Sequence, residues 1–357
     1  MRERKILNTV YIIGAGASHE VGLPTGDTLK DEIARTLYIN YAFMPSEREG
    51  NLSLWDCFKQ TYSNDEEKLK KIYSACQHIV KNLPLAISID NLLDSDALNT
   101  ELAQCGKIGI IESILKAERS SSLYFEPNEA GFADNMPNLQ STWYVQFFRR
   151  VFEGCSKDDL KERLRNITLI IFNYDRCVEH FLYHSMMQYF RLNEQECAAL
   201  LNDYLKIIHP YGTVGRLPWQ SDHNSNNTRR PFGAPADYID IINSSDSIKT
   251  FSESEGLEST VRQGIVSNMA HAERIIFLGF AYHRMNMQLL SNFGEERFIN
   301  QGKVMCLATT LGFSENDTQY VNRDIGRLYK NEVDIALESS KCCTFFQNNS
   351  RALSFDQ

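Results

Sequence analysis

Short runs of apolar and β-branched residues recur along the chain and predict buried strands. The clearest runs are 9–13, 167–172, 274–278 and 303–307, and a shorter one lies at 206–208. A continuous apolar run of this length, bounded by turn residues, is typical of a strand that is covered on both faces. The chain is therefore expected to form a mostly parallel sheet of buried strands.

Amphipathic helices are predicted between these runs. After the first run, Leu29, Ile33 and Leu37 recur at helical spacing, and residues 40–160 carry further helical stripes. Later helices are predicted near 176–190, 257–271, 284–293 and 315–330. This alternation of strands and helices indicates the α/β class, with a Rossmann-like doubly wound parallel sheet that has helices on both faces.

The same pattern divides the chain into three parts. We expect the Rossmann-like core in residues 1–38 and 160–312. Residues 39–159 are expected to form a helical insertion subdomain, because their number lies within the size range of a domain. Residues 313–357 are expected to form a C-terminal helix and tail.

The charge of the chain argues against nucleic-acid binding. The 357 residues include 37 Lys and Arg against 46 Asp and Glu, which gives a net charge of −9. Contacts to phosphates need clustered basic side chains, and no basic run follows the Arg-Glu-Arg-Lys start. We therefore expect no direct nucleic-acid partner.

Apolar stretches and cysteines bear on the compartment. No apolar stretch reaches the roughly 18–20 residues that span a bilayer, and the first apolar run leads into a glycine turn instead of a cleavage site. These features predict a cytoplasmic protein without a membrane partner. The nine cysteines show no C-x-x-C spacing, so we expect no zinc ribbon, no disulfide framework and no metal.

The first candidate site is a glycine turn after the first strand. It consists of Gly14, Ala15, Gly16, Ala17 and Ser18. Backbone amides in this position can bind a pyrophosphate, although the pattern G-x-G-x-x-G fails at its third glycine, where His19 stands. The next loop, with Pro24 and Thr25, resembles a segment that covers a ligand. An ordinary strand-to-helix turn is the alternative.

Polar residues end the next two predicted strands. Asn173, Tyr174 and Asp175 follow one strand, and His209 follows the other. Ligands bind at these carboxyl ends in open α/β sheets. The pKa of histidine lies near neutrality, which suits a general base, and the sharp loop that contains Gly212 would aim the ring at the cleft. The alternatives are structural roles for Asn173 and His209 and a helix cap for Asp175.

Two further elements are candidates for ligand binding. Gly279 and Phe280 follow the strand at 274–278, and Asn286 lies in the next helix. Gly279 permits close approach of a ligand or of another backbone, and a plain turn is the alternative. Asp90, in the predicted insertion, either caps a helix or faces the cleft.

Together these motifs resemble the sirtuin-like (Sir2-like) family. The turn GAGAS followed by GLPTG, an I-D-x-x-L element that contains Asp90, the element F-N-Y-D, a histidine loop and a late glycine loop before Asn286 occur in this order. The combination is similar to the sirtuin-like NADase domains of bacterial antiphage defence. The resemblance covers about residues 8–310.

The resemblance implies a hydrolase that converts NAD to nicotinamide and ADP-ribose. Asn173 and His209 match the catalytic residues of the family, and Asp175 matches an accessory catalytic position. The residues expected to bind NAD are Gly14, Ala15, Gly16, Ala17, Ser18, Pro24, Thr25, Asp90, Tyr174, Gly212, Gly279, Phe280 and Asn286.

The resemblance also implies a biological setting. Family members deplete NAD after a phage signal, so that the infection aborts. It implies a homo-oligomer and a separate activating partner, such as a HerA-like ATPase, a short Argonaute or a phage protein.

Departures from the deacylase sirtuins leave two other functions open. GLPTGDT stands where those enzymes carry a GIPDFR-type segment, and their zinc ribbon is missing. His209 is followed by Pro-Tyr-Gly and not directly by glycine. Protein deacylation is one alternative, and a regulatory module that binds NAD or ADP-ribose without turnover is the other.

Overall fold

Six parallel strands form the central sheet. The computed structural model describes residues 6–40, 49–126, 131–221, 228–254, 260–291, 297–300 and 302–355. The strands are β1 (Thr9–Ile13), β4 (Ile167–Ile171), β5 (Lys206–Ile208), β6 (Arg274–Leu278), β7 (Val304–Thr309) and β8 (Val333–Glu338). They lie in the order β5-β4-β1-β6-β7-β8, and each neighbouring pair is parallel. The expected α/β class and doubly wound parallel sheet are confirmed.

The path of the chain reverses beside β1. Counted along the chain, the six strands of the sheet read 3-2-1-4-5-6, which is the order of the Rossmann fold. The chain first builds the half from β1 to β5 and then returns to place β6 on the other side of β1. We call the carboxyl ends of β1 and β6 the switch point.

Both faces of the sheet are buried. Successive side chains of a strand point to opposite faces, so Val10 and Ile12 enter one hydrophobic cluster while Tyr11 and Ile13 enter the other. All five residues of β1, of β4 and of β6 are buried. This explains why these strands read as continuous apolar runs.

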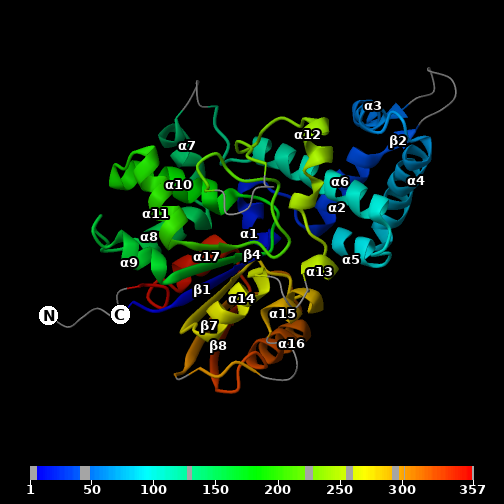
Figure 1. The fold of residues 1–357 in the computed structure, drawn as a ribbon. Coiled ribbons are helices and arrows are strands. Elements are labelled where there is room, and N and C mark those ends of the chain that lie inside the picture. Colours follow the sequence, from blue (N-terminus) through cyan, green and yellow to red (C-terminus); the bar gives the residue numbers. More distant parts are fainter. Residues whose placement is uncertain are drawn as a thin grey trace.

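Aromatic helices cover the face on which Tyr11 lies. They are α7 (Phe132–Leu139), α8 (Trp143–Val151), α9 (Leu160–Arg165), α10 (Cys177–Phe190), α11 (Glu194–Tyr204) and α17 (Cys342–Asn348). Phe147 of α8 packs edge-on against Tyr11 at 5.0 Å between ring centres. In Figure 1 the green helices α8 to α11 and the red α17 lie together on this side.

The opposite face carries the other helices. Next to the sheet are α14 (Thr260–Ala270), α15 (Arg284–Leu290) and α16 (Glu315–Gly326), drawn yellow to orange in Figure 1. A blue to cyan group extends from the switch point and contains α2 (Gly26–Leu37), α3 (Leu52–Thr61), α4 (Glu66–Asn82), α5 (Ile89–Asp94) and α6 (Thr100–Ser120).

Short elements connect these layers. They are α1 (Ala15–Ser18), α12 (Tyr238–Asn243), α13 (Phe251–Ser254), the 3-10 turns His19–Val21, Leu83–Leu85 and Ser245–Ser247, and a hairpin of β2 (Ile39–Asn40) with β3 (Glu49–Gly50). Among the described residues, no helix combines the length and the apolar content needed to cross a bilayer.

Residues 39–159 divide between two cores. The helices α3 to α6 pack with α2 in the cluster that also contains Val10 and Ile12 of β1. The helices α7 and α8 instead cover the sheet, and the indole nitrogen of Trp143 donates to the Ala17 carbonyl oxygen at 2.8 Å. The last part of the predicted insertion therefore belongs structurally to the sheet.

The C-terminal segment contains a strand that the sequence analysis missed. A helix and tail were expected for residues 313–357, but β8 pairs in parallel with β7 and forms the edge of the sheet. Its apolar residues Val333, Ile335 and Leu337 alternate with exposed ones, because an edge strand here has one covered face. The prediction relied on continuous apolar runs, and this alternating strand has none.

Candidate active site

Two glycine loops touch at the switch point. The Gly14 amide donates to the Leu278 carbonyl oxygen (2.9 Å), and the Gly16 amide donates to the Gly279 carbonyl oxygen (3.0 Å). A Cβ atom on Gly279 would lie 2.0 Å from the Ala17 nitrogen, and the φ of Gly279 is 53°. Glycine is required here because one backbone contacts another in a left-handed conformation.

These contacts use amides that were assigned to a pyrophosphate. The Ala17 amide also has a protein partner, the Gly14 carbonyl oxygen at 3.0 Å. Ala15 opens α1, where an amide has no partner within the helix. Pyrophosphate binding by the turn stays a prediction, and in this conformation the Ala15 amide is better placed for it than those of Gly14, Gly16 and Ala17.

Asn173 is attached to the glycine turn through its side chain. The residue follows β4 and is only 6% exposed. Its Nδ2 atom donates to the Gly14 carbonyl oxygen (3.1 Å) and to Ser18 Oγ (3.0 Å). A carbonyl oxygen can only accept, so these contacts fix which amide atom is nitrogen. The Oδ1 atom makes no hydrogen bond to the described residues and is left as an acceptor.

Asp175 lies beside this network and has a contact at the start of α10. Its Oδ1 atom accepts from the Cys177 amide at 3.1 Å, at the first residue of α10. The N-cap residue of α10 is Arg176, so Asp175 lies one residue before the cap and bonds to the amide two residues further on, as in an Asx turn. Burial raises the pKa of Asp175, against the opposing hydrogen bonds from Cys177 and Ser18. Asp175 therefore has a structural contact at the start of α10, but Arg176 and not Asp175 occupies the cap position.

His209 is held between two acceptors. Its Nδ1 atom lies 3.1 Å from the Asn173 carbonyl oxygen, and its Nε2 atom lies 2.6 Å from Glu179 Oε1. The His209 side chain is 11% exposed and that of Glu179 1%. Neither acceptor can donate when Glu179 is ionised, so both ring nitrogens must carry protons. With Glu179 ionised, this geometry fits an imidazolium ion beside Asn173.

The pKa of His209 agrees with this geometry. Burial alone lowers the pKa, but the charge and the hydrogen bond of Glu179, together with the Asn173 carbonyl and the charge of Asp175, raise it above the ordinary value of 6.5. A general base must be neutral before it accepts a proton. His209 can take that role only after it loses one of its two protons.

Asp90 and Asn286 line one small cavity at the strand ends. The cavity has a volume of about 200 Å³, with Phe172 and Tyr211 in its wall. The Tyr211 hydroxyl donates to Asn286 Oδ1 at 2.7 Å. Two predicted ligand-binding residues from distant parts of the sequence, in α5 and α15, therefore line the same cavity, and their binding of NAD stays a prediction.

The carboxylate of Asp90 is tied to the end of β4. It accepts a hydrogen bond from the Tyr174 hydroxyl, so these two predicted ligand-binding residues are direct neighbours. Burial raises the pKa of Asp90 to about 6, although the Tyr174 hydrogen bond lowers it. The cap of α5 is Ser88, whose Oγ accepts from the Asn91 amide at 3.1 Å.

Aromatic rings fill the crevice next to the switch point. Phe280 is 3% exposed and packs against Phe172 at 5.0 Å and against Tyr282 at 5.2 Å. Tyr211 lies 6.0 Å from Phe172. Small-molecule sites usually offer about 300–1,000 Å³, whereas the cavity beside Asp90 has about 200 Å³. The crevice is closed to a complete dinucleotide in this conformation.

The structure gives Gly212 a structural role and places Pro24 and Thr25 outside the cavities that contain Asp90 and His209. A Cβ atom on Gly212 would lie 1.9 Å from the Ser247 carbonyl oxygen, and the φ of Gly212 is 73°. Thr25 is the residue before α2, and Pro24 is half-buried. Neither Pro24 nor Thr25 lines the cavities that contain Asp90 or His209.

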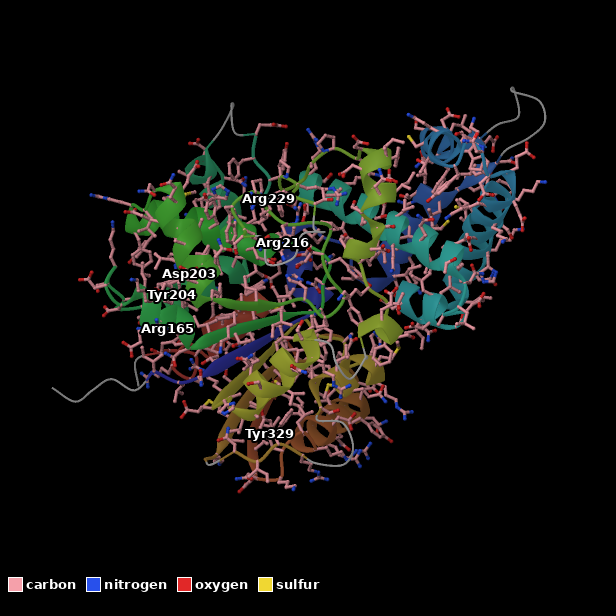
Figure 2. All side chains as sticks on the ribbon, viewed as in Figure 1. Arg165, Asp203, Tyr204, Arg216, Arg229 and Tyr329 are labelled. Atoms are coloured by element: carbon pink, nitrogen blue, oxygen red, sulfur yellow. The ribbon has the colours of Figure 1, made fainter. Side chains whose placement is uncertain are left out.

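A second cavity adjoins His209 on the β5 side. It has a volume of about 810 Å³, and its wall includes Glu179, His209 and Gly212. Arg216 also lines it, on a loop that pairs with the segment of Arg229. Figure 2 shows Arg216 and Arg229 on neighbouring loops above the sheet. This is the larger of the two cavities that contain predicted site residues.

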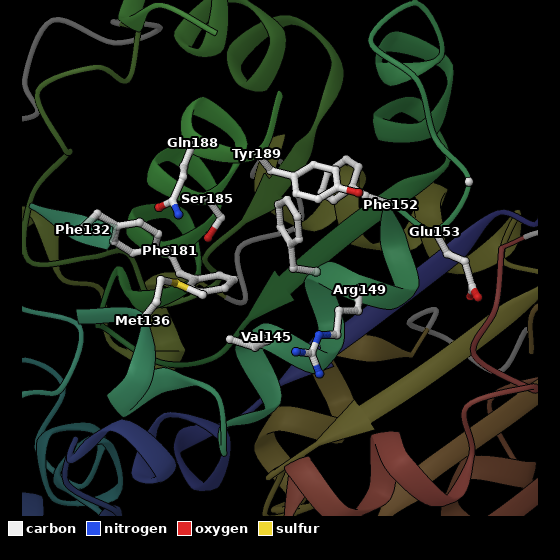
Figure 3. Close-up of a pocket in the computed structure, with 12 residues that line it drawn as sticks. Phe132, Met136, Val145, Arg149, Phe152, Glu153, Phe181, Ser185, Gln188 and Tyr189 are labelled. Carbon is white, nitrogen blue, oxygen red and sulfur yellow. The ribbon is translucent and has the colours of Figure 1, made fainter. Parts of the chain in front are cut away.

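An apolar cavity lies away from these residues. It has a volume of about 310 Å³ between α7, α8 and α10, and none of the predicted site residues lines it. Figure 3 shows Arg149 and Glu153 as its charged residues among aromatic side chains. Nothing in this lining favours catalysis.

Two buried charged groups escaped the sequence analysis. Glu179 pairs with His209, and Glu118 pairs with Arg176 through Nε at 3.0 Å. Arg176 also donates to the Arg230 carbonyl oxygen at 2.6 Å. A charged residue in a stretch as apolar as α10 is rarely buried without a partner, and this signal could have identified Glu179.

Comparison with known proteins adds no family. No protein-family model matches the sequence, and no curated protein matches it significantly.

Proposed function

We propose that the protein hydrolyses NAD to nicotinamide and ADP-ribose. The observation that carries the proposal is the junction at Asn173, whose side chain bonds to the glycine turn and whose carbonyl oxygen faces the His209 ring. The strand order supports a nucleotide ligand, because such sheets bind nucleotides at the switch point. The sequence resemblance to the sirtuin-like NADases points to NAD as that nucleotide.

The chemistry of the two residues fits this reaction. Cleavage of the bond between nicotinamide and ribose builds positive charge on the sugar, as in glycoside hydrolysis. The electron pair of that bond leaves with nicotinamide, and a water oxygen bonds to C1′. Asn173 offers a neutral acceptor, Oδ1, that can orient a water or a ribose hydroxyl without a full charge. His209 accepts the proton of the water once its ring is neutral.

The closed crevice supports a requirement for activation. Phe280 and Tyr211 pack against Phe172 at the strand ends, where the cavity beside Asp90 has only about 200 Å³. The hydrogen bonds of Tyr211 with Asn286 and of Tyr174 with Asp90 connect the strand ends to α15 and α5. Movement of these two helices away from the strand ends would open the site. We therefore assign this structure to the resting state.

The biological setting rests on the sequence resemblance. We propose a cytoplasmic effector of antiphage defence that acts as a homo-oligomer and depletes NAD after activation. The activator would be a separate HerA-like ATPase, a short Argonaute or a phage protein. The absence of a basic run in the sequence supports the view that the chain does not itself bind nucleic acid.

One incubation distinguishes the candidate functions. The purified protein is incubated with NAD, with and without the products of its neighbouring genes, and the products are separated by chromatography. Hydrolysis releases nicotinamide and ADP-ribose. Turnover that requires an acylated peptide and yields acyl-ADP-ribose would show a deacylase instead. The absence of both activities under every activator would reject the proposed hydrolase.

A regulatory module without turnover is the second candidate. The observation that favours it is the protonated His209, which cannot act as a base while Glu179 and the Asn173 carbonyl oxygen hold its two protons. Tight binding of NAD or ADP-ribose in calorimetry, with no products on the column, would support this function over hydrolysis.

A further inference from the structure

We propose that Glu179 positions His209 by holding a proton on Nε2, so that Nδ1 is the ring nitrogen that takes the proton of the attacking water. The inference rests on the proposed function and gives a role to a residue outside the strand-end motifs. Glu179 lies in the first turn of α10, and its Oε1 atom is 2.6 Å from Nε2.

Among the described residues, the surroundings of Glu179 offer its carboxyl group no other side-chain partner than His209. Its Oε2 atom is buried and makes no hydrogen bond to these residues. A buried carboxylate that loses its only partner is strongly destabilised. Glu179 therefore retains the Nε2 proton when the ring gives up its other proton.

The other nitrogen has a weaker partner. The Nδ1 atom faces the neutral carbonyl oxygen of Asn173 at 3.1 Å. A proton shared with a carboxylate is held more strongly than one shared with a neutral carbonyl. Loss of one proton thus leaves an unprotonated Nδ1, which can no longer bond to the Asn173 carbonyl oxygen because neither atom donates, and the attacking water takes the place of that contact. The Nδ1 atom accepts a proton from this water while the water oxygen bonds to C1′ and the electron pair of the glycosidic bond leaves with nicotinamide.

Charged groups on the neighbouring elements affect the protonation of His209 less than Glu179 does. Asp175, at the start of α10, acts on His209 only through its charge. The charged side chains around the adjoining cavity are Lys206, Arg216, Asp246 and Lys249. Among the described side chains, Glu179 alone bonds to the ring. Its removal is therefore the substitution that changes the protonation of His209 most.

Nitrogen-15 NMR of histidine-labelled protein tests the assignment. His209→Gln identifies the His209 signals. In the wild type we expect a doubly protonated ring that becomes the Nε2–H tautomer as the pH rises. Glu179→Gln should titrate at a lower pH, because burial lowers the pKa of His209 and Glu179 raises it. Glu179→Asp should restore part of the shift, and the exposed Glu162→Gln should cause none.

The outcomes separate this inference from the proposed function. An Nδ1–H tautomer in the wild type, or an unchanged titration in folded Glu179→Gln, would overturn the role of Glu179. If Glu179→Gln does not fold, the tautomer of His209 in the wild type and its titration in Glu179→Asp still test the role of Glu179. In active protein, Glu179→Gln should lower kcat about 10-fold or more and leave the KM for NAD unchanged. The acidic side of its pH–rate profile should move to lower pH. If the titrations are as expected but no NAD is turned over, the proposed hydrolase is rejected and the pairing of Glu179 with His209 is kept.

Discussion

At the scale of single residues, the site depends on contacts that few residue types can make. Gly279 lets one loop touch the other, Asn173 donates twice with one amide, and Glu179 is the buried carboxyl group that bonds to the His209 ring. The positions of Asn173 and His209 were predictable because both follow apolar strands. The partner of His209 was not, because a helix turn and a strand end meet only in the folded chain.

Replacement of Gly279 tests the contact between the two loops. Gly279→Ala should lower the free energy of unfolding by about 2–4 kcal/mol, because its Cβ would collide with the Ala17 backbone in a left-handed conformation. Gly302→Ala is the matched control, because its Cβ would meet nothing within 4 Å. Urea unfolding measures both. Equal stability of the two variants would contradict the close approach of the loops.

The paired His209 makes stability depend on pH. Its pKa is raised in the folded state, so the stabilisation is fully present below the ordinary pKa of 6.5 and is lost as the pH rises through the folded value. The wild type should therefore lose more stability than His209→Gln as the pH rises above about 6.5. Urea unfolding at several pH values measures the difference. Parallel curves would show that His209 is not held as a cation.

At the scale of elements, strands and helices with a regular pattern of apolar residues could be located from the sequence. The strands β1, β4, β5 and β6 match the predicted runs, except that β4 ends one residue earlier, at Ile171. The edge strand β8 was missed because its apolar residues alternate. The placement of α8 was also beyond the sequence, since a helix rich in aromatic residues can cover a sheet or another helix equally well.

The buried pair of Glu118 with Arg176 joins α6 to the start of α10. Arg176→Met should destabilise the protein by about 3–5 kcal/mol, because Glu118 would be buried without compensation. Adding Glu118→Leu should recover much of this loss. The exposed pair of Lys71 with Glu67 serves as control, and Lys71→Ala should cost at most about 0.5 kcal/mol. If the double variant is no more stable than Arg176→Met, the loss does not come from an unpaired Glu118.

At the scale of the whole molecule, the strand order determines where the site lies. Alternating strands and helices predicted the α/β class, but they do not determine on which side of β1 the later strands pack. The order found here places the turn after β1 against the loop after β6 and next to Asn173. The crevice beside Asp90 is also closed, which no sequence pattern indicated, because its closure depends on aromatic side chains from three separate segments, 172–174, 211 and 280–282.

Weakening the closure should raise basal activity. Tyr211→Phe removes the hydroxyl that donates to Asn286. A neutral hydrogen bond of about 1 kcal/mol corresponds to a population shift of roughly 5-fold toward the open state. We expect a similar rise in NAD turnover without activator, whereas Tyr320→Phe, at an exposed tyrosine, should have no effect. Lower turnover in folded Tyr211→Phe would argue that this contact belongs to the active conformation.

Chromatography of NAD reactions catalysed by three proteins tests the central claim most directly. The activated wild type should release nicotinamide and ADP-ribose in equal amounts. Asn173→Ala and His209→Ala should each reduce that release by about 100-fold or more, while circular dichroism and the unfolding transition show folded protein. Undiminished turnover in both variants would contradict the assignment of the active site to these two strand ends.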